Sequence, residues 1–202
     1  MSPSVRAASV ALSGSQIHYL EAGRGPAVLL LHGASFDATT WQSLGTLALL
    51  AERGYRAIAI DLPDYGESQR SNDPPEVVLP ELLAALALAT PAIVSPSMSG
   101  RYSLPLLVRH PEAIAGFVAV APVGIERYEA QLQGLGVPTL AVWGGNDRTV
   151  PPAEADRLCQ PLLDAEKVVL DGAGHACYMQ ATEAFHQHLL AFLQRCCGEE
   201  GN

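Results

Sequence analysis

The sequence predicts an α/β fold with a doubly wound, mostly parallel sheet that helices cover on both faces, preceded by an antiparallel hairpin. Two observations predict it: apolar runs of strand length recur along the chain, and helix-like segments separate them five times. Strands that are apolar on both faces belong inside a parallel sheet, and repeated strand–helix alternation implies right-handed crossovers. We expect one domain over residues 1–197 and a frayed tail over residues 198–202.

The elements follow in a regular order. Two extended stretches, residues 5–12 and 16–21, flank Ser13-Gly14-Ser15, which is typical of a β-hairpin. The later strands are expected at residues 27–31, 57–60, 92–94, 117–121, 139–143 and 168–170. Apolar side chains at a 3.6-residue period predict helices, and we place these at residues 40–53, 79–89, 98–110, 152–163 and 182–195, with a short one at 126–132.

The composition excludes several classes of protein. Hydrophobic residues make up 49% and charged residues 16%, so the chain can bury enough apolar surface to fold. A net charge of −9 without a basic run argues against nucleic acid and against an anionic membrane surface. No apolar run approaches the roughly 20 residues of a membrane span, and residues 1–10 lack the apolar core of a signal peptide.

The cysteines and histidines do not suggest a metal site or a disulfide framework. The four cysteines form no CxxC motif, and the six histidines do not fall at ligand spacing with them. We therefore expect reduced thiols, a cytoplasmic location, no metal and no cofactor.

Chemistry is expected at the carboxyl ends of the parallel strands, because ligands bind there in such sheets. The run at 92–94 leads into Ser95-Pro96-Ser97-Met98-Ser99-Gly100, a strand-to-helix turn that has serine where a G-x-S-x-G nucleophile elbow has glycine. Asp147 follows the run at 139–143, and His175 follows the run at 168–170. The order Ser, Asp, His matches the catalytic order of α/β-hydrolases.

Each of these residues also has a structural explanation on its own. The serine-rich turn can cap a helix, Asp147 can cap the helix that follows it, and His175 can be a surface imidazole. Their joint order favours a catalytic triad in which Ser97 is the nucleophile, Asp147 the acid and His175 the base. Ser97 occupies the middle of the frame and therefore the apex, whereas Ser95 stays in the strand and Ser99 enters the helix.

Further residues are expected around this triad. His32-Gly33-Ala34 follows the run at 27–31, where this fold supplies one oxyanion donor, so we predict the backbone N–H groups of Ala34 and Met98 as the oxyanion hole. Residues 122–138 are too few for a cap domain, which predicts a lidless, shallow site for short acyl groups rather than lipids. Side chains expected near its mouth are Phe36, Tyr65, Arg101, Tyr102, Val123, Val150 and Tyr178.

These motifs resemble the α/β-hydrolase superfamily and, more narrowly, the alpha/beta-hydrolase-domain-containing 14 subgroup. The most specific block is Ser95 to Gly100 followed by Tyr102-Ser103-Leu104-Pro105, since most hydrolases have glycine on both sides of the nucleophile. The likeness runs from about residue 27 to residue 193, and it also includes Leu31-His32-Gly33, Thr40-Trp41, Ile60-Asp61-Leu62-Pro63 and Gly172-Ala173-Gly174-His175. The resemblance implies the α/β-hydrolase fold and the same three triad residues.

The resemblance also implies a cytosolic or nuclear esterase that acts on small acyl esters. Three functions stay open: a carboxylesterase-type serine hydrolase, which we favour; an acyltransferase or protein-lysine deacetylase that passes an acetyl group to coenzyme A; and a non-catalytic interaction module on a hydrolase scaffold. The chain shows no glycine loop that would cradle phosphates, which argues against tight coenzyme A binding. The expected partner is a small acyl substrate, with neither nucleic acid nor membrane.

Overall fold

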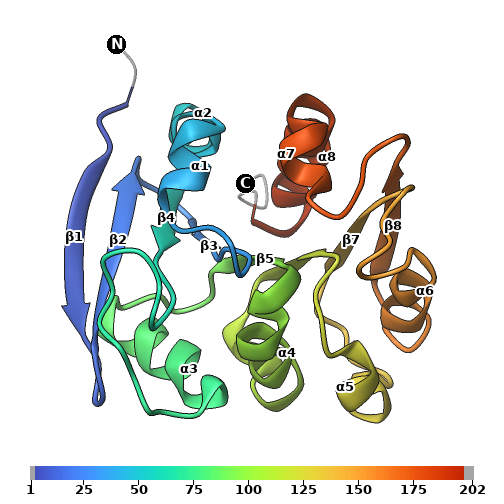
Figure 1. Cartoon of the computed structure of the whole chain (residues 1–202), viewed down its shortest axis with the longest axis horizontal. Coiled ribbons are helices and arrows are strands. Elements are labelled where there is room, and N and C mark those ends of the chain that lie inside the picture. Colours follow the sequence, from blue (N-terminus) through green and yellow to red (C-terminus); the bar gives the residue numbers. More distant parts are fainter. Residues whose placement is uncertain (1–2, 198–202) are drawn as a thin grey trace, which may run out of the picture.

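A computed structural model describes residues 3–197, so the tail expected at residues 198–202 lies outside the described residues (Figure 1). Its sheet has eight strands in the order β1-β2-β4-β3-β5-β6-β7-β8. The pairs β1–β2 and β2–β4 are antiparallel, and the remaining pairs are parallel. The strands are β1 Arg6–Ala11, β2 Gln16–Ala22, β3 Ala27–Leu30, β4 Arg56–Ile60, β5 Ala92–Pro96, β6 Gly116–Val120, β7 Thr139–Gly144 and β8 Ala165–Leu170. The predicted fold class is confirmed, hairpin included.

Helices cover both faces of this sheet. The α-helices are α1 Thr39–Ser43, α2 Thr46–Glu52, α3 Pro75–Ala85, α4 Gly100–Arg109, α5 Ile125–Leu132, α6 Ala153–Cys159, α7 Cys177–Gln180 and α8 Thr182–Cys197. Helices α1, α2, α7 and α8 lie on one face, and α3, α4, α5 and α6 lie on the other (Figure 1). Alternate strand residues point to opposite layers, so that Leu29 packs against the second group and Leu30 against the first.

Three helix predictions are wrong in detail. The helix expected at 40–53 is two helices, because Gly45 has a φ of +73° and starts a new helix. Helix α3 begins at Pro75, which suits a first-turn position, and it ends at Ala85, just before Ala87 turns the chain with a φ of +52°. Helix α6 stops at Cys159 rather than at residue 163.

Two further observations concern the helices of the structure. Helix α5 is the one α-helix that the structure places between β6 and β7, as expected for a chain without a cap domain. In the range 3–197, none of the helices combines the length and the hydropathy needed to cross a bilayer.

Candidate active site

The turn after β5 holds Ser97 in a strained backbone conformation. Ser97 has a φ of +50°, a region that costs a non-glycine residue about 1–3 kcal/mol. A short 3-10 turn, Ser97–Ser99, follows and leads into α4. At Gly100 a Cβ would lie 2.5 Å from the carbonyl oxygen of Val123, so only glycine fits there. This geometry places Ser97 at the apex of a sharp strand-to-helix turn, as in a nucleophile elbow.

The neighbouring serines are buried and bonded to one another. Ser95 Oγ lies 3.0 Å from Ser99 Oγ and 2.6 Å from Ser103 Oγ. Ser99 Oγ also donates to the carbonyl of Pro96, at 2.8 Å. All three serine side chains are fully buried, whereas Ser97 is partly exposed. Of the three serines considered for the nucleophile, Ser97 is therefore the one that a substrate can reach.

Ser97, His175 and Asp147 meet at the carboxyl edge of the sheet. Ser97 Oγ lies 2.7 Å from His175 Nε2, and His175 Nδ1 lies 2.8 Å from Asp147 Oδ2. The Asp147 carboxylate can only accept a hydrogen bond, so His175 Nδ1 carries the proton that it donates to Asp147. In this tautomer Nε2 has a free lone pair and accepts a hydrogen bond from the Ser97 hydroxyl. The structure brings together the three side chains that follow β5, β7 and β8.

The carboxylate of Asp147 is fixed by its own loop. The residue is 5% exposed, and its Oδ1 accepts the backbone N–H groups of Thr149 and Val150 at 2.8 and 2.9 Å. The loops after β7 and β8 touch closely, because a Cβ on Gly144 would lie 2.1 Å from the carbonyl oxygen of Gly174. Asp147 therefore has little freedom to turn away from His175.

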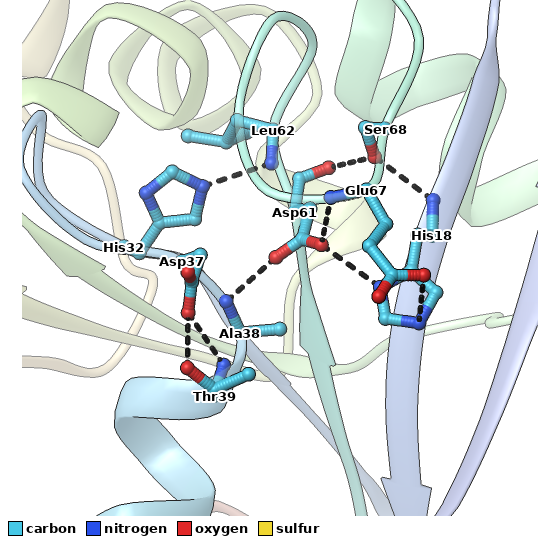
Figure 2. A network of polar contacts seen from close by, with 9 residues as sticks. All are labelled: His18, His32, Asp37, Ala38, Thr39, Asp61, Leu62, Glu67 and Ser68. Carbon is cyan, nitrogen blue, oxygen red and sulfur yellow. Dashed lines mark hydrogen bonds and ion pairs between the residues drawn. The ribbon is translucent and has the colours of Figure 1, made fainter.

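A buried carboxylate, Asp61, ties down the loop that carries Ala34. Figure 2 shows Asp61 at the centre of a polar network. Its Oδ1 accepts the N–H of Ala38 at 2.7 Å, and its Oδ2 accepts His18 Nδ1 at 2.8 Å and the N–H of Glu67 at 2.9 Å. Asp61 is 3% exposed. The loop between β3 and α1 is thus anchored to the loop after β4 and to strand β2.

His32 makes a second link between the same two loops (Figure 2). Its Nε2 accepts the N–H of Leu62 at 2.9 Å, and its Nδ1 lies 2.8 Å from the carbonyl oxygen of Gly33. Because Nε2 accepts a hydrogen bond and Nδ1 faces a carbonyl oxygen, the ring carries its proton on Nδ1. Burial lowers the pKa of His32, which favours this neutral form. The ring of Tyr65 meets it edge-on, with the ring centroids 5.0 Å apart. Sequence reasoning missed this network, since a local pattern does not reveal a partner such as His18 on another strand.

Several predicted substrate contacts lie around the elbow. A Cβ on Gly33 would be 3.4 Å from the ring of Phe36 and 3.8 Å from Ser97 Cβ, so Phe36 lies near Ser97. Arg101 and Val123 line a pocket of about 140 Å³, and Val123 and Val150 line a neighbouring hollow of about 380 Å³. Tyr102 is half-buried, and burial raises the pKa of its hydroxyl.

Tyr178 is not at the mouth of the site. Its side chain is 3% exposed and packs between Trp41 and Phe185, with ring centroids 5.0 and 6.0 Å away. Its buried hydroxyl has no hydrogen-bond partner among residues 3–197. We therefore correct the prediction and assign Tyr178 to the core beneath α7 and α8.

The thiol of Cys177, which lies two residues after His175, does not have the exposure of a reactive nucleophile. Cys177 is fully buried, and burial raises the pKa of its thiol to about 12, so it is an unreactive neighbour of His175. Among the residues that the structure describes, no three His, Cys, Asp or Glu side chains gather as a metal site would require.

The sheet, the strained turn and the serine–histidine contact define the class of this protein as an α/β-hydrolase. The model described as "Alpha/beta hydrolase family" matches residues 28–132, and the model described as "TAP-like protein" matches residues 119–199. The chain belongs to the alpha/beta hydrolase family.

Relatives confirm the resemblance to the alpha/beta-hydrolase-domain-containing 14 subgroup. Rat Protein ABHD14A is 43% identical, over 82% of this chain and 71% of that protein. Zebrafish Protein ABHD14A is 42% identical, over 83% of this chain and 64% of that protein. The human "Putative protein-lysine deacylase ABHD14B" is 39% identical, over 94% of this chain and 95% of that protein. A solved "predicted CIB-like hydrolase" from Thermoplasma acidophilum shares the fold, with a TM-score of 0.90, 22% identity and coverage of 96% of this chain and 99% of that one.

Proposed function

We propose that this α/β-hydrolase is a serine hydrolase of the carboxylesterase type, which cleaves short acyl esters through Ser97, His175 and Asp147. The observation that carries the proposal is the 2.7 Å contact between Ser97 Oγ and His175 Nε2. It is the contact that a serine nucleophile needs with its general base.

The proposed reaction has two steps. Ser97 Oγ attacks the ester carbonyl carbon while His175 Nε2 takes the hydroxyl proton, and Asp147 stabilises the imidazolium that forms. The tetrahedral intermediate collapses, the bond to the alcohol breaks, and His175 protonates the departing oxygen. Water then attacks the acyl-Ser97 ester with His175 again as base, which releases the acid and restores the hydroxyl.

We assign the oxyanion hole to the backbone N–H groups of Ala34 and Met98. Met98 follows the nucleophile directly, and Ala34 lies on the loop that Asp61 and His32 anchor. Rigid donors of this kind stabilise the negative oxygen of the intermediate, and each lowers the barrier by roughly 3–4 kcal/mol. The anchoring network supports the assignment because a donor that is already fixed needs no reorganisation during the reaction.

The expected substrates are short acyl esters. Between β6 and β7 the structure has the short helix α5 where a cap of several helices would otherwise cover the elbow. An uncovered site admits water, which favours hydrolysis over transfer, and it offers long lipid chains little surface.

Deacylation of protein lysine is the second candidate function. It is favoured by the human relative ABHD14B, whose name describes a protein-lysine deacylase and which is 39% identical along most of this chain. An open site also suits a lysine side chain on a protein surface. Transfer of the acetyl group to coenzyme A stays a prediction of the family resemblance.

The test begins with the nucleophile. A fluorophosphonate probe should label Ser97, and Ser97→Ala should abolish hydrolysis of p-nitrophenyl acetate, while Ser43→Ala at the exposed end of α1 serves as the matched control. Full turnover by Ser97→Ala would remove the proposal. An acetyl-lysine peptide, incubated with and without coenzyme A, then separates release of acetate from formation of acetyl-CoA. A protein partner that binds wild type and Ser97→Ala equally, with no turnover in either, would instead support an interaction module.

A further inference from the structure

A small pocket lies beside the nucleophile turn, at the point where three helices begin. Its volume is about 140 Å³. Pro75 and Glu76 begin α3, and Gly100 and Arg101 begin α4. The segment 123–128 comprises the turn before α5 and the first residues of that helix. The pocket is lined by Pro75, Glu76, Gly100, Arg101, Val123, Gly124, Arg127 and Tyr128.

The wall of this pocket is continuous with the proposed catalytic turn. The N–H of Val123 donates to the carbonyl oxygen of Ser97 at 2.9 Å. Gly100 packs against Val123 so closely that a Cβ would lie 2.5 Å from its carbonyl oxygen. The pocket therefore adjoins the turn that carries Ser97.

The charge of the lining is positive although the protein carries a net charge of −9. Arg101 and Arg127 line the pocket and, within residues 3–197, neither has a carboxylate within ion-pair distance. Glu76 is the one acidic residue of the lining. The guanidinium of Arg127 lies 5.8 Å from the ring centroid of Tyr128, a contact that helps to hold it in place. Two unpaired guanidinium groups against one carboxylate favour an anionic ligand.

The size of the pocket limits that ligand. A water molecule takes a share of about 30 Å³ in the liquid, so 140 Å³ has room for a carboxylate with a few carbon atoms. Guanidinium groups bind carboxylates by paired N–H donors, which suits this small anion.

We propose that the pocket binds a carboxylate on the substrate, so that the preferred substrates are small esters with an anionic group close to the scissile bond. This inference rests on the proposed function, because it places the reacting ester on Ser97. Arg101 and Arg127 are the residues that set the preference, and Glu76 opposes it.

Acetoxyacetate and acetoxyacetamide test the proposal, because they carry the same acetyl ester and differ by one charge. We expect wild type to prefer the anion. The ratio of the two kcat/KM values should fall about fivefold in Arg101→Gln and in Arg127→Gln, which is the upper range for an ion pair made by an exposed arginine. Glu76→Gln should raise the ratio. Arg24→Gln, which removes the same charge from the loop between β2 and β3, should leave it unchanged. The preference should also shrink at high salt.

A binding measurement separates this inference from the proposed function. N-acetylglycine, the amide analogue of acetoxyacetate, is titrated into Ser97→Ala protein by calorimetry, with and without the arginine substitutions. If wild type cleaves neither ester but arginine-dependent binding persists, the pocket assignment stands and the esterase proposal fails. If Ser97-dependent cleavage occurs while the arginine variants leave both the ratio and the binding unchanged, the inference is overturned.

Discussion

Replacing Asp61 by asparagine tests whether the buried network really holds the loop that carries Ala34. The carboxylate accepts three N–H groups, from Ala38, His18 and Glu67. An asparagine has the same shape but one oxygen fewer. If its oxygen faces His18 and Glu67, its NH₂ group faces the N–H of Ala38, and two donors then oppose each other inside the protein.

The magnitude follows from these contacts. A hydrogen bond to a charged group contributes about 1.5–3 kcal/mol, and a buried donor without an acceptor costs about 1–3 kcal/mol. We therefore expect Asp61→Asn to lower the free energy of unfolding by about 2–4 kcal/mol. Since Ala38 ends the segment that positions Ala34, we expect kcat for p-nitrophenyl acetate to fall about tenfold, which is less than the loss of a whole oxyanion donor.

Urea unfolding at neutral pH measures the first effect, and initial rates on folded protein measure the second. Asp64→Asn is the matched control, because Asp64 is exposed and, among residues 3–197, its one ion-pair neighbour is Arg70 at 3.9 Å. The reasoning is refuted if both asparagine variants unfold within about 0.5 kcal/mol of wild type, or if Asp61→Asn retains full kcat.

Three further predictions concern single buried groups. Burial lowers the pKa of His32 in the folded protein, so the stability that its neutral ring contributes is present above the unfolded pKa of about 6.5 and is lost as the pH falls through the folded pKa. In urea unfolding from pH 8 to pH 5, His32→Gln should therefore lose less stability than wild type. An identical dependence of unfolding free energy on pH in the two proteins would contradict this. Tyr178→Phe should unfold no more easily than wild type, since it removes a hydroxyl without a partner; a drop in Tm would indicate a contact that the structure does not contain. Gly100→Ala should lower the free energy of unfolding in urea by at least about 1–3 kcal/mol, because its Cβ would lie 2.5 Å from the Val123 carbonyl oxygen. Gly136→Ala is the control and should lose less, because its Cβ would meet nothing within 4 Å. Equal losses of stability in the two variants would show that the close approach at Gly100 does not matter.

The sequence predicts most of this fold because its central strands are apolar on both faces. Runs such as 117–121 and 139–143 signal a parallel sheet without any long-range information. The meeting of Ser97, Asp147 and His175 could be predicted for the same reason, since each lies in the loop or turn after a predicted strand. The break at Gly45 was missed because the apolar period continues through it, and only its positive φ divides the helix.

Contacts between distant segments could not be predicted in this way. His18 meets Asp61 across two antiparallel strands, 43 positions apart in the sequence. Tyr178 lies three residues beyond His175, yet α7 directs its ring into the aromatic cluster with Trp41. Glu76 and Arg127 meet in one pocket only because α3 and α5 start at the same edge of the sheet as α4.

The pairing of His18 with Asp61 gives the amino-terminal hairpin a role in the enzyme that its place at the rim of the sheet does not suggest. A shortened version of the chain that starts at β3 would lose two outer strands and would also leave the Asp61 carboxylate without its imidazole partner, next to the loop expected to bind the reacting oxygen. Removal of the hairpin at one side of the sheet should then slow catalysis as well as lower the stability of the fold. Efforts to miniaturise this protein should therefore keep β2 and remove material elsewhere.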